Sequence, residues 1–292
     1  MIDRFLNYLR SEKNRSENTI QRYEGSLRDF EAFFRTMDEG LDWTTVDSDV
    51  IRSWMEHRMD CGFTASTVNT DMAAVRSLFR FALKRKLVSK DPAHHVAGLK
   101  KQKALPYFVR ENDMDRLLDE EVWSDSYKDV RARTIIILLY ETGLRRGELV
   151  GLDDVDVDFE AMRLKVTGKR NKQRIIPFGQ EVAEQLRHYM CVRDESVEKQ
   201  CEALFLNKHG KRIGKGQVYS DVKENLSKVT MMKKRSPHVL RHSFATAMLN
   251  HDAGLESVRQ LLGHESLETT QIYTHTTFEQ LRRVYKEAHP RG

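Results

Sequence analysis

The sequence predicts a mainly helical protein with one small antiparallel sheet, divided into an N-terminal helical bundle and a C-terminal α+β domain. Apolar residues recur at spacings of three and four through the first ~100 residues, as on one face of a helix. Three short β-type runs follow one another after residue 154. A stretch rich in proline and lysine separates the two halves. With 292 residues, the chain is long enough for one large or two medium domains.

The first domain, residues 1–98, is predicted to be a small bundle of helices. Ser16 is a suitable N-cap, and it is followed by an apolar face of Ile20, Tyr23, Leu27, Phe30 and Phe33. Two more such faces comprise Val50, Ile51, Trp54, Met55 and Arg58, and Val68, Met72, Val75, Leu78, Phe79 and Ala82. These residues are most simply the core of the bundle, and we assign them no binding role.

The segment DPAHHVAGLKKQKALP, from Asp91 to Pro106, is predicted to be a linker rather than a packed element. Its prolines, its glycine and its like charges all disfavour regular packing. We place the linker itself in residues 99–106 and the second domain in residues 107–292.

The second domain is predicted to begin with helix and to return to helix after a small sheet. A helix covers roughly Arg131 to Glu141, with Gly143 as its C-terminal cap. The β-type runs are Val155–Phe159, Met162–Thr167 and Arg174–Phe178, joined by turns at 160–161 and 168–172. Later helices include Leu255–Leu262 and a final helix that starts with the capping box of Thr276 and Glu279 and bears an apolar stripe of Phe278, Leu281 and Val284.

Composition excludes several classes of protein. With 39% apolar and 32% charged residues, the chain is neither disordered nor a membrane protein, and no apolar run approaches the ~18 residues of a membrane span. The N-terminus is amphipathic rather than a secretory signal, so we expect a cytoplasmic protein. Cys61, Cys191 and Cys201 are odd in number and far apart, which favours free thiols over disulfides or a zinc site.

Positive charge is concentrated in four clusters. The net charge of +5 and the pI near 9.0 permit nucleic-acid binding without establishing it. The clusters are Lys84, Arg85 and Lys86; Lys100, Lys101 and Lys103; Lys169, Arg170, Lys172 and Arg174; and Lys233, Lys234 and Arg235. One cluster alone is usually a solvated surface, but four together favour a track for phosphates.

Motifs for bound metals and nucleotides are missing. No ATP-binding glycine loop occurs, and residue 268 after His264-Glu265 is Glu rather than the His of a zinc protease. Asp154, Asp156 and Asp158 resemble the start of a calcium loop, but later positions lack its glycine and glutamate, so we read them as the outward face of a strand. His238 and His242 have no evident third ligand. We therefore predict no metal and no cofactor.

Six residues could carry chemistry on an anionic substrate. Ser236-Pro237 looks like a helix start, which places His238 and Arg241 on one side of the first turns, beside exposed amides. Arg145 follows the Gly143 cap, Lys169 lies on a tight turn, His264 follows Gly263, and Tyr273 comes nine residues later. Taken singly, each has an ordinary structural interpretation as a surface, capping or core residue.

Together these residues lie in motifs that strongly resemble the tyrosine recombinases over essentially the whole chain. The motifs are TGLRRGELVGL around Arg145, TGKRNKQRIIPFG around Lys169, PHVLRHSFATAML around His238 and Arg241, and LLGHESLETTQIYTH around His264 and Tyr273. Within the family, the likeness is greatest to the cellular Xer subgroup, on its XerC side. Ala247 departs from the pattern, since many relatives carry histidine after FAT; this leaves the six motif positions unchanged.

The resemblance implies a fold and an activity. The first domain would be a SAM-like core-binding domain that clamps DNA, and the second a recombinase catalytic domain whose last helix docks into a neighbouring protomer. Tyr273 would attack a phosphodiester to form a 3′-phosphotyrosine. Arg145 and Arg241 would hold the non-bridging oxygens and Lys169 would protonate the leaving 5′ oxygen. His238 would accept the phenol proton or bind the phosphate, and His264 would position the tyrosine.

The implied partners are double-stranded DNA with a specific recombination site and a tetramer formed with itself or a related recombinase. A DNA translocase is a further candidate partner, and the implied task is the resolution of chromosome dimers. DNA contacts are expected from Lys84, Arg85, Lys86, Lys100, Lys101, Lys103, Arg170 and Lys172. Three alternatives stay open: an integrase of a mobile element, a type IB topoisomerase that relaxes one duplex, and a DNA-binding module without catalysis.

Overall fold

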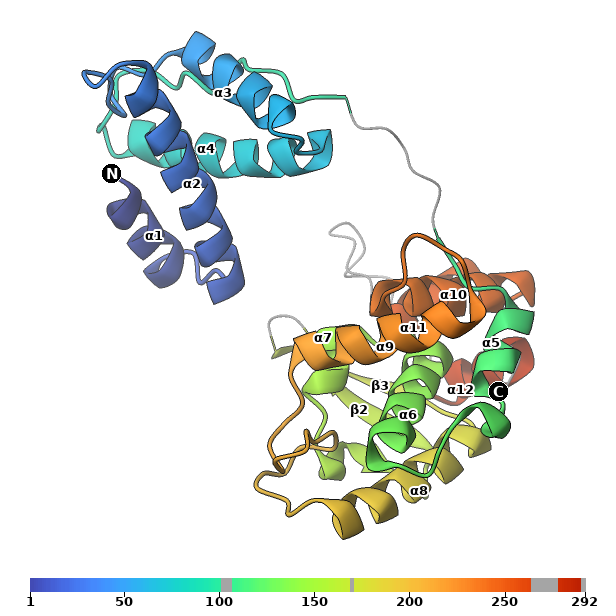
Figure 1. Cartoon of the computed structure of the whole chain (residues 1–292). Helices are drawn as coiled ribbons and strands as arrows, with labels where there is room; N and C mark the ends of the chain where they lie inside the picture. Colours follow the sequence, from blue (N-terminus) through green and yellow to red (C-terminus); the bar gives the residue numbers. More distant parts are fainter. Residues whose placement is uncertain (101–106, 169–170, 264–277, 290–292) are drawn as a thin grey trace. The chain divides into compact units, whose positions relative to one another are not determined.

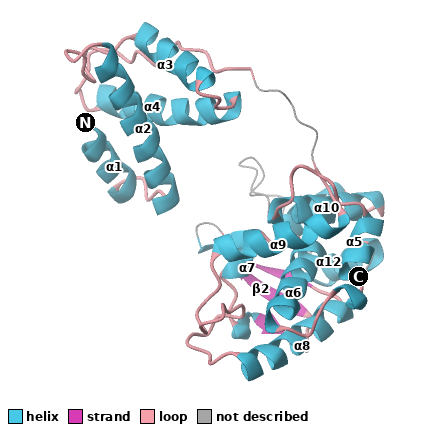
Figure 2. Cartoon of the chain, in the orientation of Figure 1, coloured by secondary structure: helices cyan, strands magenta, loops and turns pink. Residues whose placement is uncertain are grey.

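The computed structural model describes residues 1–100, 107–168, 171–263 and 278–289, without the side chains of residues 120 and 278–281. The chain divides into two compact units, Met1–Ala104 and Leu105–Gly292. The first unit is helical, and the second surrounds a small sheet with helices (Figures 1 and 2). The predicted fold class is confirmed.

The first unit is built from helices α1 to α4. They span Ile2–Ser11, Glu17–Met37, Ser48–Asp60 and Ala65–Lys84. Phe30 and Trp54 are fully buried with their ring centroids 4.9 Å apart, which confirms the predicted core. Arg58 was expected on an apolar face, yet its guanidinium bridges Asp29 and Asp71 at 3.1 and 2.9 Å. This arginine ties α3 to α2 and α4.

Residues 91–99 pack on the first unit, so the expectation that the segment from Asp91 to Pro106 is unpacked is wrong for this part of it. Ala93 and Val96 are buried in the core of the first unit, and Leu99 packs against it. The Asn69 side chain both donates to the Leu99 carbonyl and accepts from the Leu99 amide, each at 2.8 Å. Tertiary packing on α4 therefore orders a segment whose prolines and charges indicated none.

The second unit contains helices α5 to α12 and three strands. The helices span Glu111–Leu118, Tyr127–Thr142, Arg146–Val150, Gln180–Ser196, Lys215–Val229, Pro237–Asn250, Leu255–Leu262 and Phe278–Ala288. Two short 3-10 turns lie at Glu120–Val122 and Asp154–Asp156. The strands β1, β2 and β3 span Val157–Asp158, Arg163–Thr167 and Gln173–Pro177, and they form an antiparallel sheet in the order β1-β2-β3.

Helix α6 passes through the middle of this unit. Its residues from Ile135 to Leu139 are buried, because α8, α9 and α10 all pack against it. The Ser126 hydroxyl caps its start by accepting from the Asp129 amide at 3.3 Å, which lengthens the helix beyond the predicted Arg131. Gly143 ends it in the left-handed conformation, as predicted.

The first predicted strand is mostly a turn. Asp154 and Asp156 lie in a 3-10 turn rather than on the outward face of a strand, and only Asp158 of the three is in β1. Asp154 accepts from Arg193 at 2.7 Å and from Lys199 at 2.6 Å. The Asp154 carboxylate, which in the sequence resembled a calcium ligand, is therefore paired with Arg193 of α8 and with Lys199.

The last helix, α12, packs on its own unit in this single chain. Tyr285 and Ala288 are buried, and they form an apolar cluster with Phe244 and Met248 of α10 and with Leu261 of α11. The Tyr285 hydroxyl and the imidazole Nδ1 of His289 lie 3.1 and 3.0 Å from a carboxylate oxygen of Glu141, at the end of α6. In the isolated protomer, the helix thus covers its own core.

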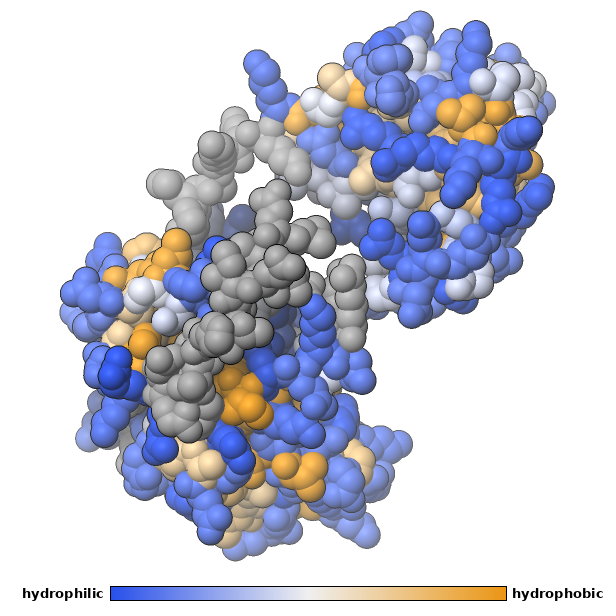
Figure 3. Space-filling model, turned by 180° about the vertical axis from the view of Figure 1, so that it is seen from behind, coloured by the Kyte–Doolittle hydropathy of each residue, from blue (hydrophilic) through white to orange (hydrophobic). Residues whose placement is uncertain are grey.

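On the face seen in Figure 3, hydrophilic residues cover most of the described surface and apolar residues form small patches. Among the described helices, none combines the length and the apolar character needed to cross a membrane.

Candidate active site

The end of α6 places Arg145 at the start of the next helix. Gly143 has a φ of +62°, and a Cβ there would lie 2.6 Å from Phe244 Cδ1 and 2.8 Å from Leu262 Cδ2. Only glycine meets both demands, since any side chain would be strained in the backbone and would overlap its neighbours. The chain therefore turns sharply, and Arg145 becomes the N-cap residue of α7.

Glu148 fixes the position of Arg145. One carboxylate oxygen accepts from the Arg145 amide at 2.9 Å, and the other accepts from its guanidinium at 2.8 Å. The same carboxylate takes a two-point contact from Arg174 of β3, at 2.8 and 2.9 Å. Burial of Glu148 acts to raise its pKa, but the bonds and charges of Arg174 and Arg145 outweigh it and lower the pKa to about 2. Glu148 is thus a permanent anion between two arginines.

Arg241 reaches the same place from α10. Helix α10 begins at Pro237 with Ser236 as its N-cap residue, as predicted, although the serine side chain makes no capping bond. Arg241 is 7% exposed, and its guanidinium donates to the carbonyl of Gly143 at 2.5 Å and to that of Leu262 at 2.7 Å. Burial and the nearby charge of Arg145 lower its pKa to about 10, so it stays charged at neutral pH.

Three arginines meet at the C-terminal end of α11. The carbonyls of Leu261, Leu262 and Gly263 accept in turn from Arg174 at 3.2 Å, Arg241 at 2.7 Å and Arg145 at 3.0 Å. The end of a helix carries partial negative charge, which favours cations there. Residues from the ends of α6 and α11, from α10 and from β3 are therefore gathered at one point.

His238 lies one turn before Arg241 and is exposed. Partial loss of solvent around the ring, followed by the charges of Arg146 and Arg241, nevertheless lowers the pKa of His238 below its ordinary 6.5. The imidazole is therefore mostly neutral at pH 7, and a neutral imidazole can accept a proton.

The charges of this region are unbalanced. In the part of the chain that the structure describes, the charge effects on Arg241 come from two further arginines, Arg145 and Arg174, and from one carboxylate, Glu148. Among these groups the cations outnumber the anion, which favours an additional anion, such as a phosphate, beside Arg145 and Arg241. The structure thus places Arg145 and Arg241 at one point, with His238 one turn before Arg241 on α10.

The other three candidates lie outside the described residues: Lys169, His264 and Tyr273. The elements that lead to two of them are described. Lys169 follows Gly168 at the end of β2, where the Gly168 amide donates to the Lys172 carbonyl at 2.7 Å and closes the hairpin. His264 follows Gly263, whose carbonyl Arg145 holds.

The predicted DNA-contacting residues have mixed surroundings. Lys101, Lys103 and Arg170 lie outside the described residues, while Lys84, Lys86, Lys100 and Lys172 are exposed. Arg85 is also exposed but pairs with Glu12 at 2.5 Å and lies 5.9 Å from the centroid of Tyr8, which joins α4 to α1. Part of its role is therefore structural.

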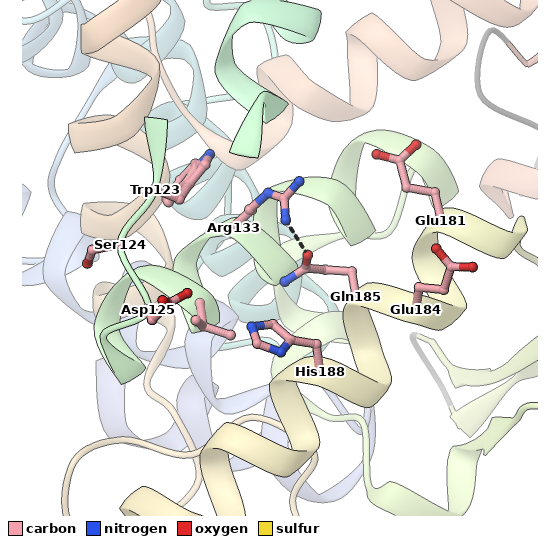
Figure 4. Close-up of a pocket in the computed structure, with 9 residues that line it drawn as sticks. Trp123, Ser124, Asp125, Arg133, Glu181, Glu184, Gln185 and His188 are labelled. Carbon is pink, nitrogen blue, oxygen red and sulfur yellow. Dashed lines mark hydrogen bonds between the residues drawn. The ribbon is translucent and has the colours of Figure 1, made fainter. Parts of the chain in front are cut away.

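A separate cavity of about 370 Å³ lies between α6, α8 and the segment before α6 (Figure 4). Arg133 donates to Gln185 at its wall, at 2.7 Å, and Trp123, Glu181 and His188 also line it. The three predicted residues that the structure describes, Arg145, His238 and Arg241, do not line this cavity, so we do not assign the site to it.

The arginine cluster consists of Arg145, Arg174 and Arg241 together with Glu148. The sequence interpretation did not identify Glu148 and Arg174 as members of it. Glu148 lies three residues after Arg145, which is the spacing of a capping box at a helix start and could have been noticed. Arg174 was counted only among the positive clusters. No spacing in the sequence links it to Glu148, because the contact joins a strand to a distant helix.

Comparison with known proteins agrees with this geometry. Residues 107–280 match the family model described as "Phage integrase family", and residues 2–86 match "Phage integrase, N-terminal SAM-like domain". The chain therefore belongs to the phage integrase family, the tyrosine recombinases, and the predicted family and enzyme class, a site-specific DNA recombinase, are confirmed.

Among curated relatives, tyrosine recombinase XerC of Pelotomaculum thermopropionicum is 36% identical over 301 residues, covering 100% of this chain and 98% of the relative. Tyrosine recombinase XerD of Oceanobacillus iheyensis is 32% identical over 294 residues, with coverage of 100% and 98%. The predicted likeness to Xer recombinases is confirmed, and both branches match to a similar degree.

Solved structures share the fold. The integrase of transposon Tn1549, in complex with transposon right-end DNA, has a TM-score of 0.74 at 20% identity and covers 98% of each chain. The XerH recombinase bound to a palindromic difH substrate has a TM-score of 0.73 at 21% identity and covers 97% of this chain and 83% of its own.

Proposed function

We propose that this recombinase breaks and rejoins DNA strands through a covalent bond between Tyr273 and a 3′ phosphate. The observation that supports the proposal is the convergence of Arg145 and Arg241, from two separate segments, on the end of α11, with His238 one turn before Arg241. That end is followed directly by His264 and, nine residues later, by Tyr273.

Each proposed role follows from the chemistry of phosphoryl transfer. The Tyr273 oxygen attacks phosphorus, a P–O bond forms, and the bond from phosphorus to the 5′ oxygen breaks. The phenol proton passes to His238, whose lowered pKa leaves it neutral, and Lys169 donates a proton to the departing 5′ oxygen. His264 hydrogen-bonds the phosphate and positions the tyrosine. The phosphotyrosine conserves the bond energy, so the 5′ hydroxyl of another strand can attack it without ATP.

The two arginines stabilise the charge that builds up on the phosphate. A guanidinium has five N–H donors, and the contacts of Arg241 with Gly143 and Leu262 use two of them. Those contacts fix its plane before substrate arrives, so little reorganisation is needed during the reaction. Loss of one such fixed donor typically lowers the rate on the order of 10²–10³-fold.

Binding and assembly complete the proposal. The first unit clamps double-stranded DNA. The DNA phosphates lie near Lys84, Lys86 and Lys100, and near Lys101 and Lys103 of the basic linker. Arg85, Arg170 and Lys172 add further contacts.

Four protomers, of this chain alone or with a related recombinase, join two duplexes, and α12 leaves its own unit to dock on a neighbour. We place this reaction in the cytoplasm, with a DNA translocase as a further partner.

The biological task that we propose is the resolution of chromosome dimers at a specific site, because the full-length curated relatives are XerC and XerD. Integration of a mobile element would use the same steps on different DNA. Sequencing the DNA that is crosslinked to the protein in its host distinguishes the two: one chromosomal site supports dimer resolution, and mobile-element ends contradict it. A two-site exchange assay run beside a relaxation assay separates recombination from topoisomerase activity.

The covalent step is tested with a nicked suicide substrate, from which the short cleaved fragment escapes so that the adduct accumulates. The natural chain should form a protein–DNA adduct that survives a denaturing gel. Tyr273→Phe should bind the DNA with similar affinity and form none, because its ring lacks the nucleophilic oxygen. An adduct formed by Tyr273→Phe would overturn the assignment of the nucleophile.

A further inference from the structure

Arg174 is more deeply embedded in the second unit than a surface arginine of a strand. Its side chain is 17% exposed, and both terminal nitrogens contact the two oxygens of Glu148, at 2.8 and 2.9 Å. Its third nitrogen, Nε, donates to the Leu261 carbonyl at 3.2 Å. All three nitrogens of the guanidinium are therefore engaged in directions that only a planar fork can satisfy.

The contacts of Arg174 join three segments that each lead to a candidate catalytic residue. Glu148 holds Arg145 through both its amide and its guanidinium. Leu261 lies at the end of α11, before His264. Arg174 itself is the second residue of β3, the strand that leaves the hairpin turn containing Lys169. Arg174 is thus the shared anchor of all three.

The base of the hairpin rests on this ion pair. A Cβ at Gly168 would lie 3.4 Å from Glu148 Oε1 and 3.7 Å from Arg174 Nη1, so the backbone of Gly168 passes directly beside both groups. Gly263 is equally close, since a Cβ there would lie 3.2 Å from the Arg174 guanidinium. The ion pair thus packs against the base of the hairpin and against the end of α11.

We infer that Arg174 is a positioning residue: through Glu148 and Gly168 it fixes the hairpin that presents Lys169 to the leaving oxygen. This inference rests on the proposed function, in which Lys169 is the general acid. Because the three guanidinium nitrogens of Arg174 contact Glu148 and the Leu261 carbonyl, we assign it no direct part in the reaction. Because a shift of about 1 Å at a reacting group can cost about 10²-fold in rate, loss of the fork should slow cleavage without weakening DNA binding.

The first measurement is single-turnover cleavage of the suicide substrate at saturating full-length protein. Arg174→Lys retains the charge but loses the fork, and we expect cleavage to fall about 10- to 100-fold with an unchanged affinity for DNA. Arg163→Lys is the matched control, because Arg163 lies in the neighbouring strand β2 and bonds Asp158 at 2.9 Å. It should cleave at the natural rate. Natural-rate cleavage by Arg174→Lys would overturn the inference.

The second measurement separates positioning of the general acid from general loosening of the fold. A substrate with sulfur in place of the 5′ bridging oxygen releases a thiol, whose low pKa makes protonation of the leaving group unnecessary. Lys169→Ala and Arg174→Lys should both recover most of their lost rate on this substrate. Arg241→Ala should recover little, since its defect concerns the non-bridging oxygens.

The two possible failures are distinguishable. If Lys169→Ala recovers and Arg174→Lys does not, Arg174 does not act through the hairpin and the inference is wrong, while the proposed function stands. If Lys169→Ala itself does not recover, the general-acid assignment fails, and the role of Arg174 fails with it.

Discussion

Two buried glutamates, Glu141 and Glu148, hold parts of the second unit together in different ways. Glu148 accepts from the backbone and side chain of Arg145 and from both terminal nitrogens of Arg174. One oxygen of Glu141 accepts from the Tyr285 hydroxyl at 3.1 Å and lies 3.0 Å from His289 Nδ1. Its other oxygen has no hydrogen-bond partner among the described residues.

The difference lies in what each carboxylate holds. Glu148 joins groups of the arginine cluster with partners that are charged at every ordinary pH. Glu141 holds the last helix, α12, with a phenol and an imidazole. Burial, followed by the charge of Glu141, raises the pKa of Tyr285 well above its ordinary value, so the hydroxyl stays a donor. The arginine cluster is thus held by permanent charges, whereas α12 is held by weaker and exchangeable bonds.

The largest effect should come from Glu148→Gln. A pKa of about 2, against an ordinary 4.5, means that the folded state favours the ionised form by about 3 kcal/mol, and a neutral amide loses most of this. Urea unfolding at pH 7 measures the loss. Glu184→Gln, at an exposed site on α8, is the control and should change stability by less than about 0.5 kcal/mol.

The same prediction has a dependence on pH. Because the pKa of Glu148 is lower in the folded state, its contribution is complete above pH 4.5 and is lost as the pH falls toward 2. The natural chain and Glu148→Gln should therefore differ in stability at pH 7 and converge near pH 2. A difference that stays constant over this range would contradict the ion-pair account.

A smaller effect is expected from Glu141→Gln, which keeps an acceptor for Tyr285 but loses the charge that faces His289. Stability should fall by about 1–2 kcal/mol, and proteases should cut the C-terminal segment faster, since α12 detaches more readily. Adduct formation on the suicide substrate should remain near the natural rate. Glu287→Gln, at an exposed position of α12, should leave proteolysis unchanged. Equal losses of cleavage in Glu141→Gln and Glu148→Gln would remove the distinction between the two regions.

The smallest effect concerns His238. Burial first, and then the charge of Arg146, lowers its pKa, so the acid limb of the pH profile of kcat/KM should lie below pH 6.5. Arg146→Ala removes that charge and should move the limb upward, toward 6.5, by a fraction of a pH unit. Arg187→Ala, at an exposed arginine of α8, should leave the limb in place. An unmoved limb in Arg146→Ala would mean that His238 does not set it.

Much of the fold was predictable because local residues determine it. The helix Leu255–Leu262 and the cap at Gly143 were placed correctly, since periodicity and glycine act within a few residues. The order in residues 91–99 was not predictable, because it depends on the distant Asn69 and on the core of the first unit. Likewise, the motifs pointed to Arg145, His238 and Arg241. The contact of Glu148 with Arg174 could not be predicted, because it depends on how β3 packs beside α7.

The three consecutive carbonyls at the end of α11 have a mechanical consequence. The Gly263 carbonyl is the last of the three acceptors in that row, and Arg145 donates to it. A displacement of this end of α11 would therefore move the acceptors of Arg145, Arg241 and Arg174 together. The end of α11 and the three guanidiniums bonded to it are thus mechanically coupled, so a shift of one displaces the others.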